Sequence, residues 1–259
     1  MTEVVLDINK SLEENASDYY ESAKKMKKKI EGAKEAIAKT EEKLAKIEKQ
    51  HQKIKAETPK PKVARKKEWY EKFRWFYSTE GFLCIGGRDA TTNEIVIKKH
   101  MEALDVVFHT DMAGSPFFII KTEGREVGQQ TLNEVAQATA AYSRAWKAGM
   151  ITTDVFHVKP EQVSKEAQSG EFMGKGAFMI RGKTTYLHPD IKLAIGIKEG
   201  QIIGGPVEAI TKNAEKYVVL IQGEEKASKA AKEIAKKLGG GEIDDIIRFI
   251  PAGGVKLLK

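Results

Sequence analysis

His109 and Asp111, one residue apart in the segment HTDMAGS, are the side chains of this sequence that most resemble an acid–base pair. An imidazole near a carboxylate can act as a general base with an orienting partner. The pair has no nucleophile beside it, because Ser115 precedes a proline and stands in no G-x-S-x-G frame. A hydrogen-bonded structural turn and a polar contact to RNA are the alternatives, and we predict no catalytic residue.

The sequence contains no characteristic set of residues for binding a metal or a cofactor. The single cysteine, Cys84, lies in the apolar run FLCI, where we expect a buried and unreactive thiol. No other His or Cys accompanies His109 at a spacing that would ligate zinc. The paired glycines near 174 and 204 fit neither the dinucleotide fingerprint nor the phosphate-binding loop. We therefore predict no metal and no cofactor.

Basic side chains occur where predicted strands end. The chain has 44 Lys and Arg residues against 37 Asp and Glu, a net charge of +7, and a basic surface attracts phosphate groups. Arg88 stands in the turn GGRD, which we place between two strands. A structural pair with Asp89, an Asx turn and a contact to RNA are its alternative roles.

A second basic cluster lies in the hairpin sequence GEFMGKGAFMIRGK, where strand alternation places Phe178 and Arg181 on opposite faces. Basic and aromatic side chains together suit single-stranded or looped RNA, although an ordinary amphipathic hairpin shows the same pattern. The candidates for contact with RNA are Arg74, Arg88, Lys98, Lys99, His109, Asp111, Arg144, Lys165, Lys175, Arg181 and Lys183.

The elements that must position these residues begin with a heptad pattern over residues 12–54, in which apolar positions alternate spacings of three and four. Ser11 suits an N-cap. We predict a coiled-coil arm roughly 64 Å long, at about 1.5 Å per residue. Its partner would be another copy of the chain or a segment that precedes this sequence. Alternatively, the lysines of the arm line an RNA backbone.

After the prolines of TPKP end this helix, the sequence changes to short elements. Trp69, Phe73 and Phe76 have the spacing of one face of a short helix, which we expect to pack in the core. Strands are expected near 81–86, 94–99, 105–109, 116–121, 154–159, 176–182, 184–187, 191–197, 201–203 and 216–222, and helices at 129–147, 225–238 and 242–249.

These elements predict an α+β fold, with a long N-terminal coiled-coil helix followed by a mixed or antiparallel sheet and packed helices. The sequence has neither a signal peptide nor an apolar run that could span a bilayer, so we expect a cytoplasmic protein without a membrane partner. The expected divisions are a coiled-coil arm at 1–57, a basic linker at 58–67, a sheet domain at 68–190, and a C-terminal continuation or small α/β subdomain at 191–259.

Three motifs of this sequence resemble the NFACT family of ribosome quality control factors. They are IGGRDATTNE, the H-x-D-x-x-G turn that begins at His109, and QVSK followed by SGE and GAFMIRGK. The resemblance implies that 68–190 is the RNA-binding domain of that family and that the preceding helix belongs to its coiled-coil middle region. Many relatives have histidine where this chain has Ala113, which argues further against catalysis.

The resemblance also implies a function. NFACT proteins bind obstructed large ribosomal subunits that carry peptidyl-tRNA, and they support addition of residues to the nascent chain without mRNA. The ribosome performs that chemistry, so the resemblance implies a binding factor rather than an enzyme, with the large subunit, rRNA and tRNA as partners. The large N-terminal domain of the family does not occur in this sequence, so we expect a fragment of a longer, archaeal protein.

Two other functions stand beside this one. The heptad pattern would suit a coiled-coil scaffold that recruits protein partners and has only incidental affinity for RNA. A hydrolase or transferase that uses His109 and Asp111 is the third hypothesis.

Overall fold

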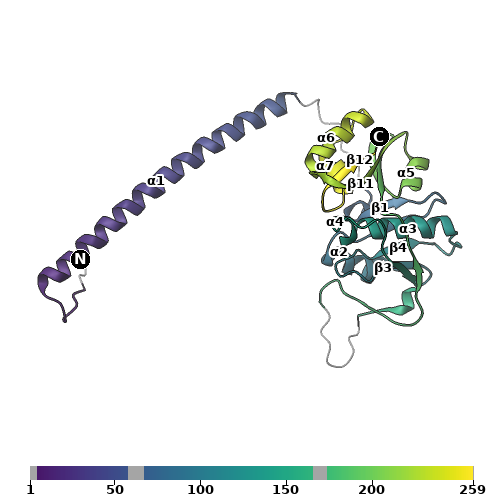
Figure 1. Cartoon of the computed structure of the whole chain (residues 1–259), viewed down its shortest axis with the longest axis horizontal. Coiled ribbons are helices and arrows are strands. Elements are labelled where there is room, and N and C mark those ends of the chain that lie inside the picture. The colour runs from purple at the N-terminus through teal and green to yellow at the C-terminus, as the bar shows by residue number, and fades with distance from the viewer. Residues whose placement is uncertain (1–4, 58–66, 166–173, 259) are drawn as a thin grey trace. The chain divides into compact units, whose positions relative to one another are not determined.

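The computed structural model describes residues 5–57, 67–165 and 174–258 of the chain (Figure 1). It divides into two compact units, one that ends at residue 66 and one that begins at residue 67. The first is built on one helix, and the second on three antiparallel sheets.

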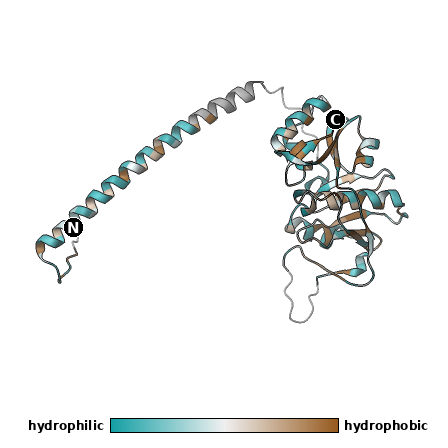
Figure 2. Cartoon of the chain, viewed as in Figure 1, coloured by the Kyte–Doolittle hydropathy of each residue, from teal (hydrophilic) through white to brown (hydrophobic). Residues whose placement is uncertain are grey.

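Helix α1, Leu12–Glu57, is continuous over 46 residues, which confirms the predicted long helix. It begins with a capping box, in which the backbone N–H of Glu14 donates to the Ser11 hydroxyl and that of Ser11 donates to the Glu14 carboxylate. Apolar side chains recur along its polar length (Figure 2), and the leucine, methionine and isoleucine side chains from Leu12 to Ile47 are more than half exposed. The predicted coiled-coil seam is thus open to a partner over these residues. The side chains of positions 51 and 54 lie outside those described.

The first sheet of the second unit has six antiparallel strands in the order β1-β2-β4-β3-β5-β8. Helix α3 (Gln129–Ala141) covers it and presents small side chains, which allow close approach to β3 and β5. Strand β4, in the middle of the order, is buried along its whole length. The strands are β1 (Arg74–Tyr77), β2 (Leu83–Gly86), β3 (Val106–Thr110), β4 (Phe118–Lys121), β5 (Val155–Val158) and β8 (Thr185–Leu187).

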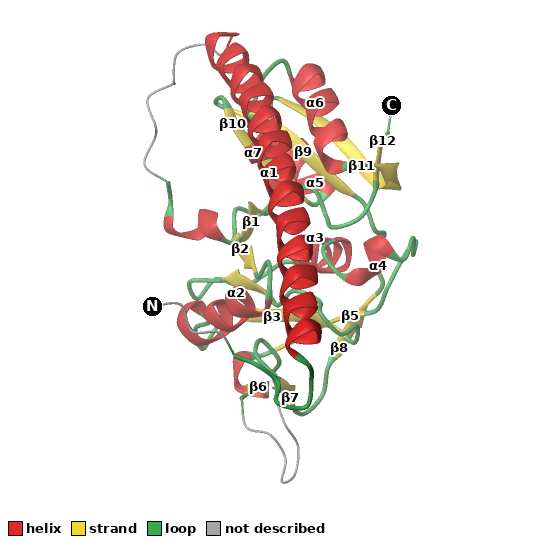
Figure 3. Cartoon of the chain, turned by 90° about the vertical axis from the view of Figure 1, so that its left-hand side faces the viewer, coloured by secondary structure: helices red, strands yellow, loops and turns green. Residues whose placement is uncertain are grey.

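The second sheet has four antiparallel strands in the order β10-β9-β11-β12 (Figure 3). It shares one core with the first sheet, because a Cβ added at Gly205 would lie only 3.0 Å from the Cβ of Phe76 on β1. Its elements are β9 (Leu193–Lys198), β10 (Gln201–Gly205), α5 (Val207–Asn213), β11 (Lys216–Glu225), α6 (Ala227–Leu238), α7 (Ile243–Phe249) and β12 (Val255–Leu257).

Shorter elements complete the second unit. Helix α4 (Arg144–Lys147) follows α3, and the 3-10 turn η3 (Pro160–Gln162) leads into β6 (Val163–Ser164). Strand β6 pairs with β7 (Met179–Ile180) in a two-stranded hairpin. The division predicted at residue 190 stays a prediction about family domains, since residues from 67 onward pack as one unit.

The α+β class is confirmed, but the strand predicted at 94–99 is wrong. This segment is helix α2 (Ala90–Ile95) continued by the π-helical turn η2 (Val96–His100). The side chain of Asp89 caps α2 by accepting from the backbone N–H of Thr92 at 2.8 Å. This cap overrides the strand preference of the isoleucine and valine residues that follow. The GGRD turn therefore joins a strand to a helix.

The short helix predicted over Trp69, Phe73 and Phe76 is also wrong. Only the 3-10 turn η1 (Trp69–Lys72) forms, and β1 begins two residues later. The two phenylalanines are buried as predicted, whereas Trp69 is exposed and stacks on the His100 ring at 4.6 Å between centroids.

The expected helix at 129–147 is interrupted, because the Ser143 hydroxyl accepts from the backbone of Ala145 and starts α4. Helix α5 and strand β12 were not predicted. Among the described residues, none of the helices combines the length and apolar character needed to cross a bilayer.

Asp105→Ala should destabilise the second unit strongly. The Lys121 ammonium is buried, lies 2.6 Å from the Asp105 carboxylate, and donates to the His100 carbonyl at 2.9 Å. Losing the carboxylate leaves a buried charge without its nearest partner, so we expect the free energy of unfolding in urea to fall by about 3 kcal/mol. Glu233→Ala breaks an exposed pair with Lys237 and should cost less than about 0.5 kcal/mol. Similar losses in the two variants would contradict this account.

Candidate functional site

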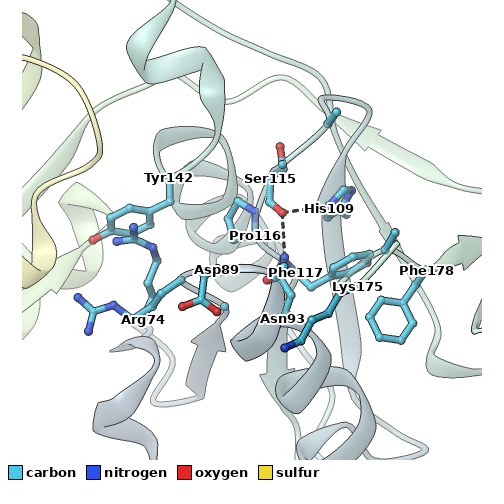
Figure 4. Close-up of a pocket in the computed structure, with 17 residues that line it drawn as sticks. Arg74, Asp89, Asn93, His109, Ser115, Pro116, Phe117, Tyr142, Lys175 and Phe178 are labelled. Atoms are coloured by element: carbon cyan, nitrogen blue, oxygen red, sulfur yellow. Dashed lines mark hydrogen bonds between the residues drawn. The ribbon is translucent and has the colours of Figure 1, made fainter. Parts of the chain in front are cut away.

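A cleft of about 310 Å³ opens in the second unit beside the start of α2. Its walls come from β1, residues 87–93, the β3–β4 loop at 113–117, Tyr142, and residues 175–178 (Figure 4). Arg74 and Tyr142 lie at one end of the cleft and Phe178 lies at the other, with the Lys175 side chain between them. Five segments of the chain thus meet at one concave surface.

The buried amide of Asn93 joins two of these walls. Its Nδ2 donates to the Ser115 carbonyl at 3.2 Å, and its Oδ1 accepts from the Phe117 backbone at 3.0 Å. Gly87 leaves the space for this side chain, because a Cβ there would lie 1.9 Å from Asn93 Oδ1. Gly87, the second glycine of GGRD, therefore allows close packing in the cleft wall as well as the turn.

Arginines concentrate positive charge at one end of the cleft. The Arg74 guanidinium stacks on the Tyr142 ring, with its Cζ 3.7 Å from the ring centroid. Burial lowers the pKa of Arg74, and the charge of Arg88 lowers it further. Arg88 donates from Nη2 to the Arg248 carbonyl at 3.3 Å, and burial followed by the charge of Arg248 lowers its pKa. Both guanidiniums nevertheless remain protonated at any physiological pH.

These charges are only partly compensated. The lining contains three cationic side chains, those of Arg74, Arg88 and Lys175, and one carboxylate, that of Asp89. Within the described parts of the chain, no carboxylate forms an ion pair with either arginine. The Nη1 of Arg74 is buried and has no hydrogen-bond partner there. Such an arrangement favours an anionic ligand, because an unpaired buried cation is costly.

The hairpin forms the opposite wall and is held in place by Lys165. The Lys165 ammonium donates to the carbonyls of Gly174 and Ala177 at 3.0 and 2.9 Å, and lies 4.9 Å from the Phe178 ring centroid. Gly176 packs directly on α2, since a Cβ there would be 2.6 Å from the backbone of Ala90. This close docking leaves Lys175 exposed at the mouth of the cleft.

His109 and Asp111 do not form a hydrogen-bonded pair. His109 Nε2 lies 3.3 Å from the Ser115 carbonyl, and its ring stacks on Phe117 with 4.0 Å between centroids. Asp111 instead accepts from the Tyr186 hydroxyl at 3.3 Å. The general-base arrangement is therefore not built, and His109 supports the β3–β4 loop as a structural turn residue.

The predicted contact residues fall into three groups. Arg74, Arg88, His109 and Lys175 line the cleft. Lys165 positions the hairpin, and Arg144 lies beside Gly114 in the cleft wall. The structure does not bring the remaining candidates into the cleft: Lys98 pairs with Glu94, and Lys99, Asp111, Arg181 and Lys183 are exposed elsewhere on the unit.

Sequence reasoning missed three contributors to the site. Asn93 carries no signal, because it lies just before the strand expected at 94–99. Tyr142 falls within the helix expected at 129–147, where nothing marks it as a site residue, and Arg248 lies far away in sequence. No spacing rule links these residues, since their contacts arise from packing between elements.

The family model described as the NFACT protein RNA binding domain matches residues 72–182, and the model described as NFACT N-terminal and middle domains matches residues 1–71. The chain belongs to the NFACT family. The first match contains every residue that lines the cleft, whereas Arg248 lies beyond it.

Other NFACT relatives are much longer than this chain. The archaeal Rqc2 homologue aRqcH of Methanocaldococcus jannaschii is 42% identical over 207 residues, 77% of this chain and 31% of that protein. The ribosome quality control complex subunit NEMF of Homo sapiens is 38% identical over 176 residues, 68% of this chain and 16% of that protein. The C-terminal part of the fibronectin/fibrinogen-binding protein from Streptococcus suis, a solved structure, is 18% identical with a TM-score of 0.39, covering 50% of this chain and 49% of that chain.

Acid should destabilise the NFACT fold partly through His109. Burial lowers the pKa of His109 below its ordinary 6.5, so the unfolded chain binds more protons than the folded one. Stability is thus full above pH 6.5 and falls as pH drops through that value. In urea unfolding, His109→Gln should lose less stability between pH 7.5 and 5.5 than the parent chain. Part of the slope should remain, because burial also lowers the pKa of His100 and His157. An unchanged slope would disprove this role.

Asn93→Ala should loosen the cleft walls. The variant leaves the Ser115 carbonyl with one fewer donor and the Phe117 N–H without its acceptor, both in buried surroundings. We expect unfolding in urea to become easier by about 2 kcal/mol. Asn133→Ala removes an exposed amide of α3 that accepts from the Gln129 side chain, and should change stability by less than about 0.5 kcal/mol. Amide hydrogen exchange at 113–117 should quicken in Asn93→Ala alone.

Proposed function

We propose that this chain is the RNA-binding module of a ribosome-associated quality control factor. In this role it would help to hold obstructed large ribosomal subunits that carry peptidyl-tRNA, and would support addition of residues to the nascent chain without mRNA. Its RNA partners would be rRNA and tRNA, in the cytoplasm. Its relatives support the setting, because their names place them in ribosome quality control.

The observation that carries the proposal is the charge of the cleft. Arg74 and Arg88 lie close together, partly withdrawn from water, and lack ion-paired carboxylates in the described parts of the chain. A guanidinium can bind phosphate through two donors or stack on a base, so RNA supplies both kinds of partner. A cleft with these unpaired positive charges favours a ligand that carries phosphate groups.

We propose a binding factor rather than an enzyme. The side chains that could have supplied acid–base chemistry, His109 and Asp111, are engaged with the Ser115 carbonyl and the Tyr186 hydroxyl. The proposed role requires no bond-making by this chain, because the ribosome supplies the peptidyl-transfer step.

A second candidate function is a protein-interaction scaffold, and helix α1 favours it. The leucine, methionine and isoleucine side chains of its seam are exposed, as expected of a helix that pairs with another helix. The partner would be a second copy or a preceding segment of the protein. The two functions are compatible, since the arm could extend a module that grips RNA.

Binding of tRNA should be tight at low salt and weaken steeply as salt rises, because phosphate contacts release counterions. Arg88→Glu with Lys175→Glu reverses two charges that line the cleft, and should weaken tRNA binding by at least tenfold in a gel-shift assay. Lys232→Glu with Lys236→Glu makes the same charge change on α6, where both side chains are exposed.

The α6 control should weaken binding far less than the cleft variant. Equal losses of affinity in the two variants would show that tRNA binding depends on the net charge of the chain and not on where the charges lie. If the chain failed to bind tRNA or rRNA fragments near physiological salt and instead captured a helical protein partner, the scaffold function would replace the RNA-binding one.

A further inference from the structure

We infer that the cleft binds one unstacked nucleotide of single-stranded RNA, with its phosphate at Arg74, Arg88 and Lys175 and its base against Phe178. This inference rests on the proposed function, because it names the part of the RNA that the site would take. It adds a ligand size, an orientation and a low dependence on base identity.

The size of the cleft favours a single nucleotide. Its volume of about 310 Å³ lies at the lower end of the range for small-molecule sites. The minor groove of an A-form duplex is wide and shallow, so its base edges could not enter a concave site of this size. A loop or single strand can turn one base outward at low cost, because that base has no pairing partner to lose.

The phosphate end is defined by unused donors. Among the residues that the structure describes, Arg74 Nη1 is buried without a partner, and Arg88 uses one of its five N–H donors, to the Arg248 carbonyl. Lys175 faces them from the hairpin with its side chain exposed. A phosphate between the two sides would join the α2 wall to the hairpin wall. The Asp89 carboxylate accepts from the Thr92 backbone, and it acts on Arg88 through its charge without an ion pair among the described residues.

The base end is defined by Phe178. This ring lines the cleft, is half buried, and meets Phe117 edge to face with 5.4 Å between centroids. Its position is preset, since Lys165 holds the hairpin through two carbonyls. A base that stacks here gains affinity through its π-face, which all four bases possess.

The polar groups in the middle of the cleft are occupied. Both ends of the Asn93 amide and the Ser115 carbonyl already have partners within the protein. They are therefore not free to read the hydrogen-bonding edge of a base. We expect the cleft to accept different bases with similar affinity.

The test uses the full chain and three fluorescein-labelled RNA probes in polarisation assays: hexauridylate, its analogue with abasic central positions, and a twelve-base-pair duplex. Hexauridylate should bind at least tenfold more tightly than the duplex. Arg88→Gln and Lys175→Gln should each weaken hexauridylate at least fivefold and lower the salt slope by about one. Phe178→Ala should weaken hexauridylate at least fivefold but leave the abasic analogue within twofold.

Lys236→Gln is the matched control, because it removes one exposed charge outside the cleft and should change each affinity by less than twofold. Circular dichroism and thermal unfolding would establish that each variant is folded. Replacing uridine by adenosine should alter affinity by less than fivefold.

The outcomes separate this inference from the proposed function. If tRNA binding remained tight and salt-dependent while Arg88→Gln, Lys175→Gln and Phe178→Ala behaved like Lys236→Gln, the cleft assignment would be wrong and the RNA-binding function would stand. If the chain bound neither tRNA nor hexauridylate, both would fail. A duplex that bound as tightly as hexauridylate, or an equal loss of the abasic analogue in Phe178→Ala, would also overturn the single-nucleotide arrangement.

Discussion

The side-chain amide of Asn93 is the interaction on which the candidate site depends. It ties the first turns of α2 to the β3–β4 loop through one donated and one accepted hydrogen bond. Both partners are buried backbone groups, and the Phe117 N–H would otherwise be unsatisfied, so the loop has little freedom to adopt another path. Gly87 is required by the same contact, because only a residue without Cβ leaves room for the amide. The positions of α2 and of the loop, and with them the cleft, thus depend on one side chain.

The second constraint is the desolvation of two arginines. Holding like charges close together in a partly buried site costs free energy, and the lowered pKa values of Arg74 and Arg88 are its sign. Stacking on Tyr142 recovers part of this cost for Arg74. The remainder must be supplied by the large shared core of the two sheets. Proteins tolerate such local costs mainly where a ligand later offsets them.

Local sequence signals predicted the elements whose pattern is strong and failed where contacts between distant elements decide. The long helix, its Ser11 cap, and the helices near 227 and 243 follow from periodicity and capping residues. The segment from Ile95 to Lys99 has the composition of a strand, yet the cap at Asp89 and burial of its apolar residues make it helical. The sequence identifies basic residues as candidates for contact with RNA, but it does not show which of them lie in the cleft. Alternation along the hairpin says nothing about whether Lys175 or Arg181 faces α2, because that depends on the docking of Gly176 against Ala90.

The C-terminal sheet and its helices contribute to the site although no residue of theirs lines the cleft. Helix α7 ends beside Arg88 and Tyr142. The Arg248 carbonyl accepts from Arg88, and the Phe249 carbonyl accepts from the Tyr142 hydroxyl at 2.9 Å. Carbonyls in the last turn of a helix lack partners within the helix and carry partial negative charge, so they suit a neighbouring cation. They orient Arg88 and fix the ring on which Arg74 stacks, without introducing a carboxylate that would neutralise either arginine. Residues beyond the family match at 182 therefore belong to the machinery of the proposed RNA site, and a version of this module truncated there would lose the orientation of its cations even if the first sheet still folded.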